Sequence, residues 1–548
     1  MAQVEIGFEA PAVDWWLLTP QIILVGAALG LLLVASLAPR ALPDWASTAT
    51  SIATGGAVAI VAAAQWSDWG SASRSTLSDA FVSDGFSLLL TVLVGAGVVM
   101  TALVAHSALD RYGMAPPEFA ALLLASAAGA VVMAGANDLI VLFLGLESLS
   151  IALYVLIALA GRRAPARESA MKYFVLGAFS SAFFLYGIAL VYGSTGSTNL
   201  SGMGGFLFGS NRYDSDYLNL ETDYLLLVGI ALLLVGLGFK VAAVPFHFWA
   251  PDVYEGAPSP VTGYLASIAK AAGFAALARV LYVAVAEQST AWAPILIGLA
   301  FATLAVGAVM AICQNDVKRM LAYSSISHAG FVLVGLSSVV GSGERAQWLV
   351  RVAGEASRVV TYGSAGGGDA VSSAVFYLVA YSFMALGSFA VLSVVGAELR
   401  SPESDASTHA LSRYGGLARR RPVLALAFTV LLLAQAGVPF TSGFWAKVEV
   451  IRASIGAEGY VLAAVAMVTA VVSAFAYLRV VLAMYAPEDS ADGDDSAPAA
   501  RAGRPRWGGL PLTSVLAIGL AVAATVVVGV LPQTLLEWSR DAVLSIVP

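Results

Sequence analysis

The sequence predicts an all-α polytopic membrane protein with about 14 transmembrane helices, and three observations carry that prediction. Of the 548 residues, 59% are hydrophobic and only 11% are charged, whereas an ordinary soluble domain has about 25% charged residues. So few charges cannot cover the apolar surface of a soluble chain of this size. Long apolar stretches also recur along the chain, each near the roughly 20 residues that a helix needs to cross a bilayer. The solvent of this protein is therefore expected to be lipid.

Fourteen stretches meet this requirement of length and composition. They lie at residues 17–38, 47–66, 82–105, 118–135, 138–160, 170–192, 223–249, 261–285, 292–313, 319–340, 370–397, 422–450, 458–486 and 510–534. The first follows Glu5, Glu9 and Asp14, whereas a signal peptide begins with basic residues. We therefore expect the first stretch to be a transmembrane helix and not a cleaved signal.

The basic residues predict how these helices are oriented, because cytoplasmic loops are enriched in Lys and Arg. If the N-terminus lies outside, the inside connections carry fifteen basic residues and the outside segments carry seven. With fourteen spans, both termini are then expected outside. The Ala- and Arg-rich composition indicates a GC-rich bacterial genome, which makes the bacterial plasma membrane the expected location.

Lysine is rare in this sequence and unusually placed. Only five of the 28 basic residues are lysine. Lys240, Lys270 and Lys447 lie within apolar stretches, together with Glu147 and His328. An ionisable group at the bilayer centre costs about 2.5–3.5 kcal/mol, so three lysines and a glutamate cost on the order of 12 kcal/mol. These groups must therefore face the bundle interior or water, where they can pair with other groups.

Lysine suits a site whose charge must come and go. The pKa of a lysine falls from about 10.4 to about 5–6 on burial, whereas arginine stays protonated. We interpret Glu147, Lys240, Lys270, His328 and Lys447 as an interior row of proton-holding sites. His247 and Lys172 are further candidates nearer the ends of their spans.

Each candidate also has a purely structural explanation. Charged groups can form static ion pairs between helices, and lysines near the end of a span can extend their head groups to the interface. Interior histidines can simply be hydrogen-bonded core residues. The first explanation applies to Glu147, Lys240 and Lys270, the second to Lys447 and Lys172, and the third to His247 and His328.

Two spans contain similar interruptions, VPFHFWAPDV at 244–253 and VPFTSGFWAKVEV at 438–450. Pro245 and Pro439 each interrupt the helical hydrogen bonds inside an apolar stretch. The first lies in the seventh predicted span and the second in the twelfth. Because five spans, an odd number, separate them, two five-helix units that contain them have opposite membrane topology. Prolines in matching positions of two such units are typical of inverted repeats with an ion site. The sequence therefore predicts two inverted five-helix repeats with broken helices 7 and 12.

These features divide the chain into five expected parts. They are helices 1–3 in residues 1–117, the first repeat (helices 4–8) in 118–285, the second repeat (helices 9–13) in 292–486, an inside loop with acidic and basic residues at 487–509, and the fourteenth helix in 510–548. Outside loops are expected at 194–222 and 341–369.

The composition also excludes several functions. A single cysteine, Cys313, cannot form a self-contained iron–sulfur cluster or a cysteine-ligated zinc site. The net charge of −7 argues against binding of nucleic acid. No Gly-rich phosphate loop follows a predicted strand, so nucleotide binding is not expected. We therefore expect neither metal nor cofactor on this chain.

The sequence blocks around the interior charges resemble a known family. GLGFKVAAVPFHFWAPDVYEGAPSPVTGYLASIAK (236–270), KRMLAYSSISHAGFVLVG (318–335) and AGVPFTSGFWAKVEV (436–450) are similar to the antiporter-like, proton-pumping membrane subunits of respiratory complex I, most of all to its N-type subunits. The resemblance covers roughly residues 120–485. It implies partner membrane subunits, including sister antiporter-like subunits, in a bilayer, with FMN, iron–sulfur clusters and quinone on the partners.

The resemblance also implies roles for individual residues. Glu147 matches a glutamate that pairs with a lysine, here Lys240, and Lys270 matches the lysine at the centre of the channel. Lys447 matches the lysine toward the other side of the membrane. His247 and His328 fall where the family places relay histidines.

Three functions follow as hypotheses. The first is a proton-translocating subunit of NADH:quinone oxidoreductase, driven by quinone reduction on partner subunits. The second is the large subunit of a multisubunit Na⁺/H⁺ antiporter, which needs no redox partner. The third is a structural spacer whose interior charges serve only helix assembly.

Overall fold

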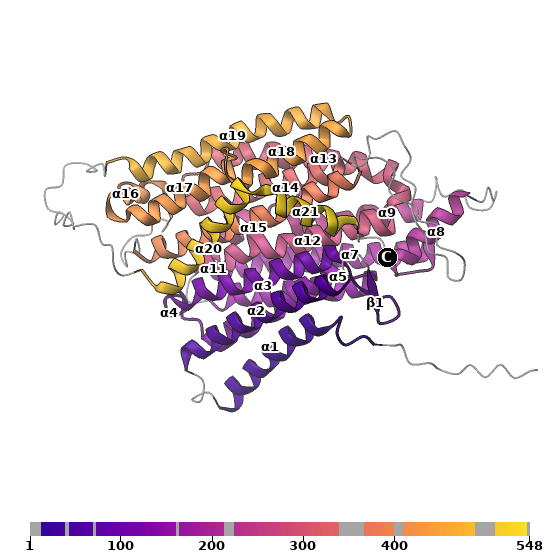
Figure 1. Ribbon diagram of the computed structural model, residues 1–548, viewed down its shortest axis with the longest axis horizontal. Coiled ribbons are helices and arrows are strands. Elements are labelled where there is room, and N and C mark those ends of the chain that lie inside the picture. Colours follow the sequence, from indigo (N-terminus) through magenta and orange to yellow (C-terminus); the bar gives the residue numbers. More distant parts are fainter. Residues whose placement is uncertain are drawn as a thin grey trace, which may run out of the picture.

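The protein is a bundle of long helices that run roughly along one axis (Figure 1). The structure, a computed structural model, describes residues 13–38, 43–69, 73–160, 164–212, 224–338, 367–398, 409–487 and 510–544. Within these ranges, 13 helices are long and apolar enough to cross a membrane. A shorter apolar helix at Pro422–Ala436 joins them. The prediction of a helical, multi-pass membrane protein is confirmed.

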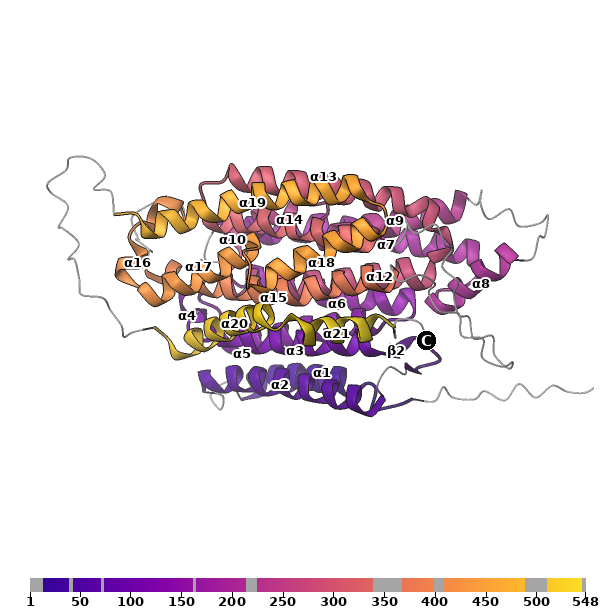
Figure 2. The ribbon, with the colours of Figure 1, turned by 45° about the horizontal axis from the view of Figure 1, so that its top comes forward.

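The first part of the chain starts at one edge of the bundle and leads inward to a largely buried third helix. Its elements are α1 (Thr19–Leu37), α2 (Asp44–Trp69), strands β1 (Arg74–Thr76) and β2 (Phe81–Ser83), and α3 (Gly85–His106). Helices α1 and α2 lie side by side along one edge (Figure 2). The antiparallel pairing of β1 with β2 was not expected from the sequence. Three consecutive residues with positive φ, Leu77–Asp79, make the tight turn between the two strands.

The next part contains the expected helices 4–8. Its elements are α4 (Leu109–Tyr112), α5 (Pro116–Gly135), α6 (Leu139–Ala158), α7 (Ala164–Thr195), α8 (Leu200–Arg212), α9 (Tyr224–Val241), α10 (Trp249–Gly256), α11 (Ser259–Tyr264), the π-helical turn η2 (Leu265–Ala269), α12 (Lys270–Arg279), the π-helical turn η3 (Val280–Ala284) and the 3₁₀ turn η4 (Ala286–Gln288). Two expectations are wrong in detail. Helix α8 occupies much of the expected loop 194–222, and α9 ends before the expected residue 249 because Pro245 cannot continue the helical hydrogen bonds.

The remaining elements include the expected helices 9–14. They are α13 (Ser289–Ile312), α14 (Val317–Ser337), α15 (Gly367–Glu398), the 3₁₀ turn η5 (Leu411–Tyr414), α16 (Leu417–Arg420), α17 (Pro422–Ala436), α18 (Ser442–Gly456), α19 (Tyr460–Tyr485), α20 (Leu512–Val530) and α21 (Pro532–Leu544). The expected span 422–450 is divided between α17 and α18. The turn between them contains Gly437 at φ 90° and Phe440 at φ 66°, beside Pro439.

The end of the chain also differs from the prediction. The last helix does not stop near residue 534, because α21 follows α20 directly and extends to Leu544. The loops expected at 341–369 and 487–509 lie almost entirely outside the described residues. The inverted relation between the two five-helix units stays a prediction.

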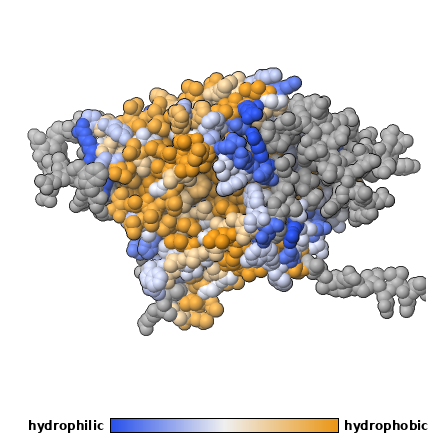
Figure 3. Space-filling view, viewed as in Figure 1, coloured by the Kyte–Doolittle hydropathy of each residue, from blue (hydrophilic) through white to orange (hydrophobic). Residues whose placement is uncertain are grey.

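The centre of the bundle is formed by α12, α14 and α15. Every residue of α14 is buried except Arg319, and its neighbours α10, α13, α15, α18 and α19 surround it. The outer helices expose large apolar side chains instead, and the face shown in Figure 3 is a broad apolar surface with hydrophilic residues toward its edges. This distribution places the charged residues of α12 and α14, apart from Arg319, in the interior of the protein.

Candidate functional site

The interior row predicted from the sequence is buried in the structure. The exposed fractions are 4% for Lys240, 2% for Lys270, 3% for His328 and 6% for Lys447. These residues come from α9, α12, α14 and α18, so four helices contribute one ionisable group each. Buried cations and imidazoles require hydrogen-bond partners, and those partners define the site.

Lys240 lies at the end of α9, where it contacts α6 and α7. Its ammonium group donates to the hydroxyl of Ser150 at 2.9 Å and to that of Tyr173 at 3.5 Å. Ser150 in turn donates to the Leu146 carbonyl at 2.5 Å. The lysine is therefore held by hydroxyl groups.

Glu147 does not form the direct ion pair with Lys240 that the sequence led us to expect. Among the described residues, no contact within 4.0 Å joins the two charges. Glu147 accepts a short hydrogen bond from the Ser181 hydroxyl of α7 instead. Ser150, one turn beyond Glu147 on α6, takes the place of the carboxylate beside the lysine. The two charges interact only across this hydroxyl-lined space.

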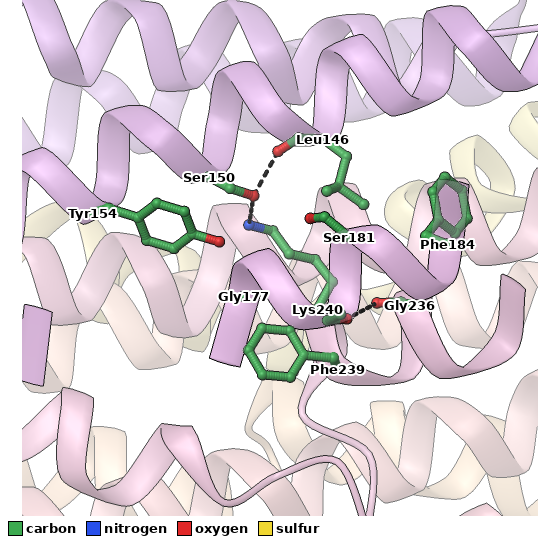
Figure 4. A pocket seen from close by; sticks show the side chains of 10 residues that line it. Leu146, Ser150, Tyr154, Gly177, Ser181, Phe184, Gly236, Phe239 and Lys240 are labelled. Carbon is green, nitrogen blue, oxygen red and sulfur yellow. Dashed lines mark hydrogen bonds between the residues drawn. The ribbon is translucent and has the colours of Figure 1, made fainter. Parts of the chain in front are cut away.

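A small cavity lies beside Lys240 and reaches Ser181, the partner of Glu147. Its volume is about 10 Å³, close to the minimum that one water molecule requires. Lys240, Ser150 and Ser181 are among its lining residues (Figure 4). The Ser181 hydroxyl that faces the cavity also donates to Glu147. A single water here would connect the lysine to the glutamate through Ser181.

The next step of the row joins Lys240 to Lys270. The side chain of Lys240 lies directly over Gly273, where an added Cβ would be 3.1 Å from the lysine Cγ. Gly273 is one turn beyond Lys270 on α12, so the two lysines lie on contacting helix surfaces. The Lys270 ammonium donates to the Ser325 carbonyl of α14 at 2.9 Å. The π-helical turn η2 ends immediately before Lys270, and such turns are frequent at functional sites.

His328 lies between two tyrosine hydroxyls. Its Nδ1 is 2.6 Å from the Tyr377 hydroxyl and its Nε2 is 3.0 Å from the Tyr477 hydroxyl. The imidazole also stacks on Tyr381, with ring centroids 4.6 Å apart. Because both ring nitrogens have partners, a proton can enter the imidazole on one side and leave on the other.

A chain of polar groups continues from His328 toward Lys447. The Tyr477 hydroxyl makes a short hydrogen bond with that of Ser324. Ser324 donates to Oε1 of Gln435 at 3.4 Å, and Nε2 of Gln435 donates to the Ser388 hydroxyl at 2.8 Å. These groups come from α14, α15, α17 and α19, so the chain crosses the centre of the second unit.

Lys447 caps the break between α17 and α18. Its ammonium donates to the main-chain carbonyls of Gln435 at 2.9 Å and Ala436 at 2.8 Å. The Gln435 carbonyl would normally accept from the amide four residues on, but that residue is Pro439, which has no N–H. The proline thus leaves the Gln435 carbonyl without its usual main-chain donor, and the Lys447 ammonium donates to it instead.

Two sequence candidates lie apart from this row. His247 is half-buried on the turn between α9 and α10, where its Nδ1 is 3.3 Å from the Pro245 carbonyl. Lys172 is 42% exposed and binds Glu168 at 2.7 Å and Asp252 at 2.9 Å. The structure brings neither side chain into hydrogen-bond contact with the interior lysines.

Lys172 belongs to a charged cluster at the end of the bundle where α7 and α14 begin. Arg319 binds Asp252 at 2.9 Å and Glu255 at 2.7 Å, so the cluster joins α7, α10 and α14. Partial burial alone would raise the pKa of Asp252, but hydrogen bonds and charges from Lys172 and Arg319 outweigh it and hold that pKa below its ordinary value.

One interior charge pair was missed in the sequence. Arg279 at the end of α12 is 1% exposed and binds both oxygens of Asp84, at 2.8 and 2.9 Å. Asp84 is fully buried and also caps α3 by accepting from the Ser87 amide at 2.8 Å. The sequence contains a sign of this pair, because Arg279 is a charged residue inside the expected apolar span 261–285. The hydroxyls of Tyr477 and Ser324 gave no such signal, because neutral residues do not stand out in an apolar helix.

Comparison with known proteins places this architecture in one family. The family model described as NADH:quinone oxidoreductase/Mrp antiporter, TM, matches residues 136–352 and 359–473. NADH-quinone oxidoreductase subunit N of Acidothermus cellulolyticus is 37% identical in an alignment of 559 positions that covers 97% of each chain. The Mycobacterium tuberculosis subunit N is 38% identical over 436 residues, covering 79% of this chain and 72% of that protein.

Solved structures agree. A chain of Thermus thermophilus respiratory complex I aligns with a TM-score of 0.70 and 31% identity, covering 94% of this chain and 98% of that chain. A chain of the Mrp complex from Dietzia sp. aligns with a TM-score of 0.77 over 98% of both chains, but at 21% identity it shows the fold alone. The buried lysine row and these relatives together show that the chain belongs to the NADH:quinone oxidoreductase/Mrp antiporter family of membrane subunits, among the N subunits of NADH-quinone oxidoreductase.

Proposed function

We propose that this chain is a proton-translocating membrane subunit of an NADH:quinone oxidoreductase, and that protons move along Glu147, Lys240, Lys270, His328 and Lys447. The observation that carries the proposal is the arrangement of three buried lysines and a buried histidine in contacting helices of one chain. A static scaffold has no need for four such costly groups in one row. The relatives named NADH-quinone oxidoreductase subunit N support the assignment to that complex.

The energy for transport comes from partner subunits in this proposal. FMN, the iron–sulfur clusters and the quinone site are assigned to those partners, and sister antiporter-like subunits adjoin this chain in the membrane. The residues of this chain hold and move protons, while the redox reaction takes place elsewhere.

The Glu147 region starts the sequence of transfers. The carboxylate of Glu147 favours the charged form of Lys240 across the small cavity. A movement of α6 or α7 that separates the two groups favours release of the proton from Lys240 toward Lys270. Lys270 passes the proton toward His328 and Lys447, and Lys447 releases it toward the outside. Lys172 and His247 lie off this row and are proposed only as accessory groups.

The orientation is proposed from the distribution of basic residues. The start of α1 and the end of α21 lie at the same end of the bundle (Figure 1), as an even number of crossings requires. With the arginine-rich connections inside, both termini face outside, and the location is the bacterial plasma membrane.

The runner-up function is the large subunit of a multisubunit Na⁺/H⁺ antiporter. The likeness to the Mrp complex supports a shared fold, whereas identities of 37–38% connect this chain to N subunits of the oxidoreductase. The two functions differ in their partners and in their dependence on Na⁺.

Purification in mild detergent through a tag on this chain distinguishes the two functions. The proposal predicts that the eluate oxidises NADH, reduces quinone and contains flavin and iron–sulfur clusters. If only small hydrophobic partners without metal are recovered, and cells show Na⁺-dependent proton exchange, the antiporter function is correct instead.

A further inference from the structure

Gln435 has the geometry of a residue that sets the direction of a hydrogen-bonded chain. Its side-chain nitrogen Nε2 donates to the Ser388 hydroxyl at 2.8 Å and lies 3.4 Å from the Leu431 carbonyl. A main-chain carbonyl can only accept, so the NH₂ side of the amide must face Leu431. The oxygen Oε1 therefore faces Ser324, at 3.4 Å.

This orientation fixes every donor and acceptor between Gln435 and Tyr377. Because Oε1 only accepts, Ser324 donates its single hydroxyl proton to Gln435. Ser324 must then accept from the Tyr477 hydroxyl in the short bond that joins them. Tyr477, having donated, must accept from Nε2–H of His328 at 3.0 Å.

The remaining nitrogen of His328 follows from the same rule. In a neutral imidazole one nitrogen carries the proton and the other accepts. With the proton on Nε2, Nδ1 accepts from the Tyr377 hydroxyl at 2.6 Å. All donors thus point from Tyr377 through His328 and Tyr477 toward Gln435, and the chain has one direction.

We propose that Gln435 is a positioning residue that sets, and after each transfer restores, the direction of a proton-conducting chain from His328 through Tyr477 and Ser324 to the Lys447 end of the site. This inference rests on the proposed function. Tyr377 passes its hydroxyl proton to Nδ1 of His328 as it takes up another from the Lys270 side, and His328 releases the Nε2 proton to Tyr477. The proton of Tyr477 passes to Ser324, and the Ser324 proton leaves the chain toward the lone pair of a neutral Lys447. One proton enters and one leaves.

Such a transfer leaves the hydroxyl groups reversed. The amide of Gln435 cannot follow that reversal, because Leu431 and Ser388 hold its NH₂ side. Only a Ser324 hydroxyl that points back to Oε1 satisfies the amide, so the chain returns to its first direction. The nitrogen of Lys447 lies 2.9 Å from the main-chain carbonyl of Gln435, at this end of the chain. In its neutral form Lys447 has the lone pair that takes up the proton.

A double-mutant cycle in the intact complex tests the inference. The variants are Tyr477→Phe, Gln435→Leu and their combination. The purified complex is reconstituted in proteoliposomes, and proton uptake is divided by the amount of complex recovered. Tyr477→Phe is expected to slow pumping about tenfold or more, because it removes a relay hydroxyl. Gln435→Leu is expected to slow it about fivefold, through the loss of one orienting hydrogen bond.

The combined variant gives the decisive readout. If Gln435 acts through Tyr477, the double variant pumps within about twofold of Tyr477→Phe alone, because coupled residues are not additive. Multiplied effects, or wild-type pumping by either single variant, would overturn the inference. Should Gln435→Leu fail to assemble, the isosteric Gln435→Glu replaces it in the same cycle.

Two further variants keep the result interpretable. Tyr264→Phe is the matched control, because Tyr264 is equally buried and its hydroxyl has no hydrogen-bond partner among the described residues. It is expected to pump like the wild type. Lys270→Ala tests the proposed function itself. Loss of pumping by Lys270→Ala beside normal pumping by Tyr477→Phe would defeat only the inference about Gln435, whereas normal pumping by Lys270→Ala would defeat the function.

Discussion

The side chain of Lys240 crosses α12 directly over Gly273, where any added side chain would crowd it. A Cβ at position 273 would be 3.1 Å from Cγ of Lys240 and 3.0 Å from Cγ1 of Val241. The close approach brings α9 and α12 together, and with them the first two lysines of the row. Small residues allow this kind of contact between membrane helices.

Gly273→Val is therefore expected to displace Lys240 from the Ser150 hydroxyl. Overpacking a tight contact costs about 1–3 kcal/mol, so the complex should still assemble while its proton pumping falls severalfold. The measurement is proton uptake by proteoliposomes per complex recovered. Gly298→Val is the control, because a Cβ there lies more than 4 Å from every described atom outside its own stretch of helix. Equal pumping by the two variants would contradict the role of this contact.

Gly437→Ala tests the break that Lys447 caps. Gly437 has φ 90°, and an added Cβ would be 3.0 Å from Cδ of Lys447. The left-handed backbone costs roughly 1–2 kcal/mol for a residue with a side chain, and the contact pushes the ammonium away from its carbonyl partners. We expect reduced pumping and a lower Tm of the purified complex. Gly456→Ala, where a Cβ meets no described atom beyond its own stretch of helix within 4 Å, should change neither quantity.

The pair formed by Arg279 and Asp84 is expected to be structural. Removal of one partner leaves a buried charge alone, which costs about 3–5 kcal/mol. Arg279→Met should therefore lower the yield of assembled complex strongly, and the double variant with Asp84→Asn should recover part of it. Yield and subunit composition after purification measure both effects. Arg452→Met, at a side chain that is 66% exposed, should assemble normally, and a similar loss for that variant would show that the burial of Arg279 is not the cause.

The cluster around Asp252 predicts a specific dependence on pH. Because the pKa of Asp252 is held below its ordinary value, its contribution to stability is complete above the pKa of an unfolded aspartate, about 3.9. That contribution is lost only as the pH falls further, through the folded pKa. Asp252→Asn should thus lower the Tm of the complex by the same amount at pH 6 and pH 8. A difference that vanished at pH 6 would mean that Asp252 titrates near neutrality.

The sequence is a good guide to those parts of the molecule that the bilayer itself constrains. Apolar stretches of membrane length predict the helices, and the cost of charge in lipid makes Lys240, Lys270 and Lys447 conspicuous. Pro245 and Pro439 predict where helices stop, because a missing N–H has the same effect in any fold.

Contacts between distant segments are less predictable. Ser150 and Ser181 separate Glu147 from Lys240, and this depends on how α6 and α7 are rotated about their axes. The same is true of Tyr477, Ser324 and Gln435, which become neighbours only when α14, α17 and α19 pack. The short hairpin of β1 and β2 escapes a search for membrane spans because each strand has three residues.

The most direct test of the central claim is proton pumping by a Lys270→Ala complex in proteoliposomes, measured together with its NADH:quinone activity. Lys270 is fully buried and connects the Lys240 side of the row to α14 through the Ser325 carbonyl. If protons move along this row, the complex assembles correctly, but its pumping and the NADH oxidation coupled to it are largely lost. Full pumping by an assembled Lys270→Ala complex would contradict the claim that protons cross the membrane along this row.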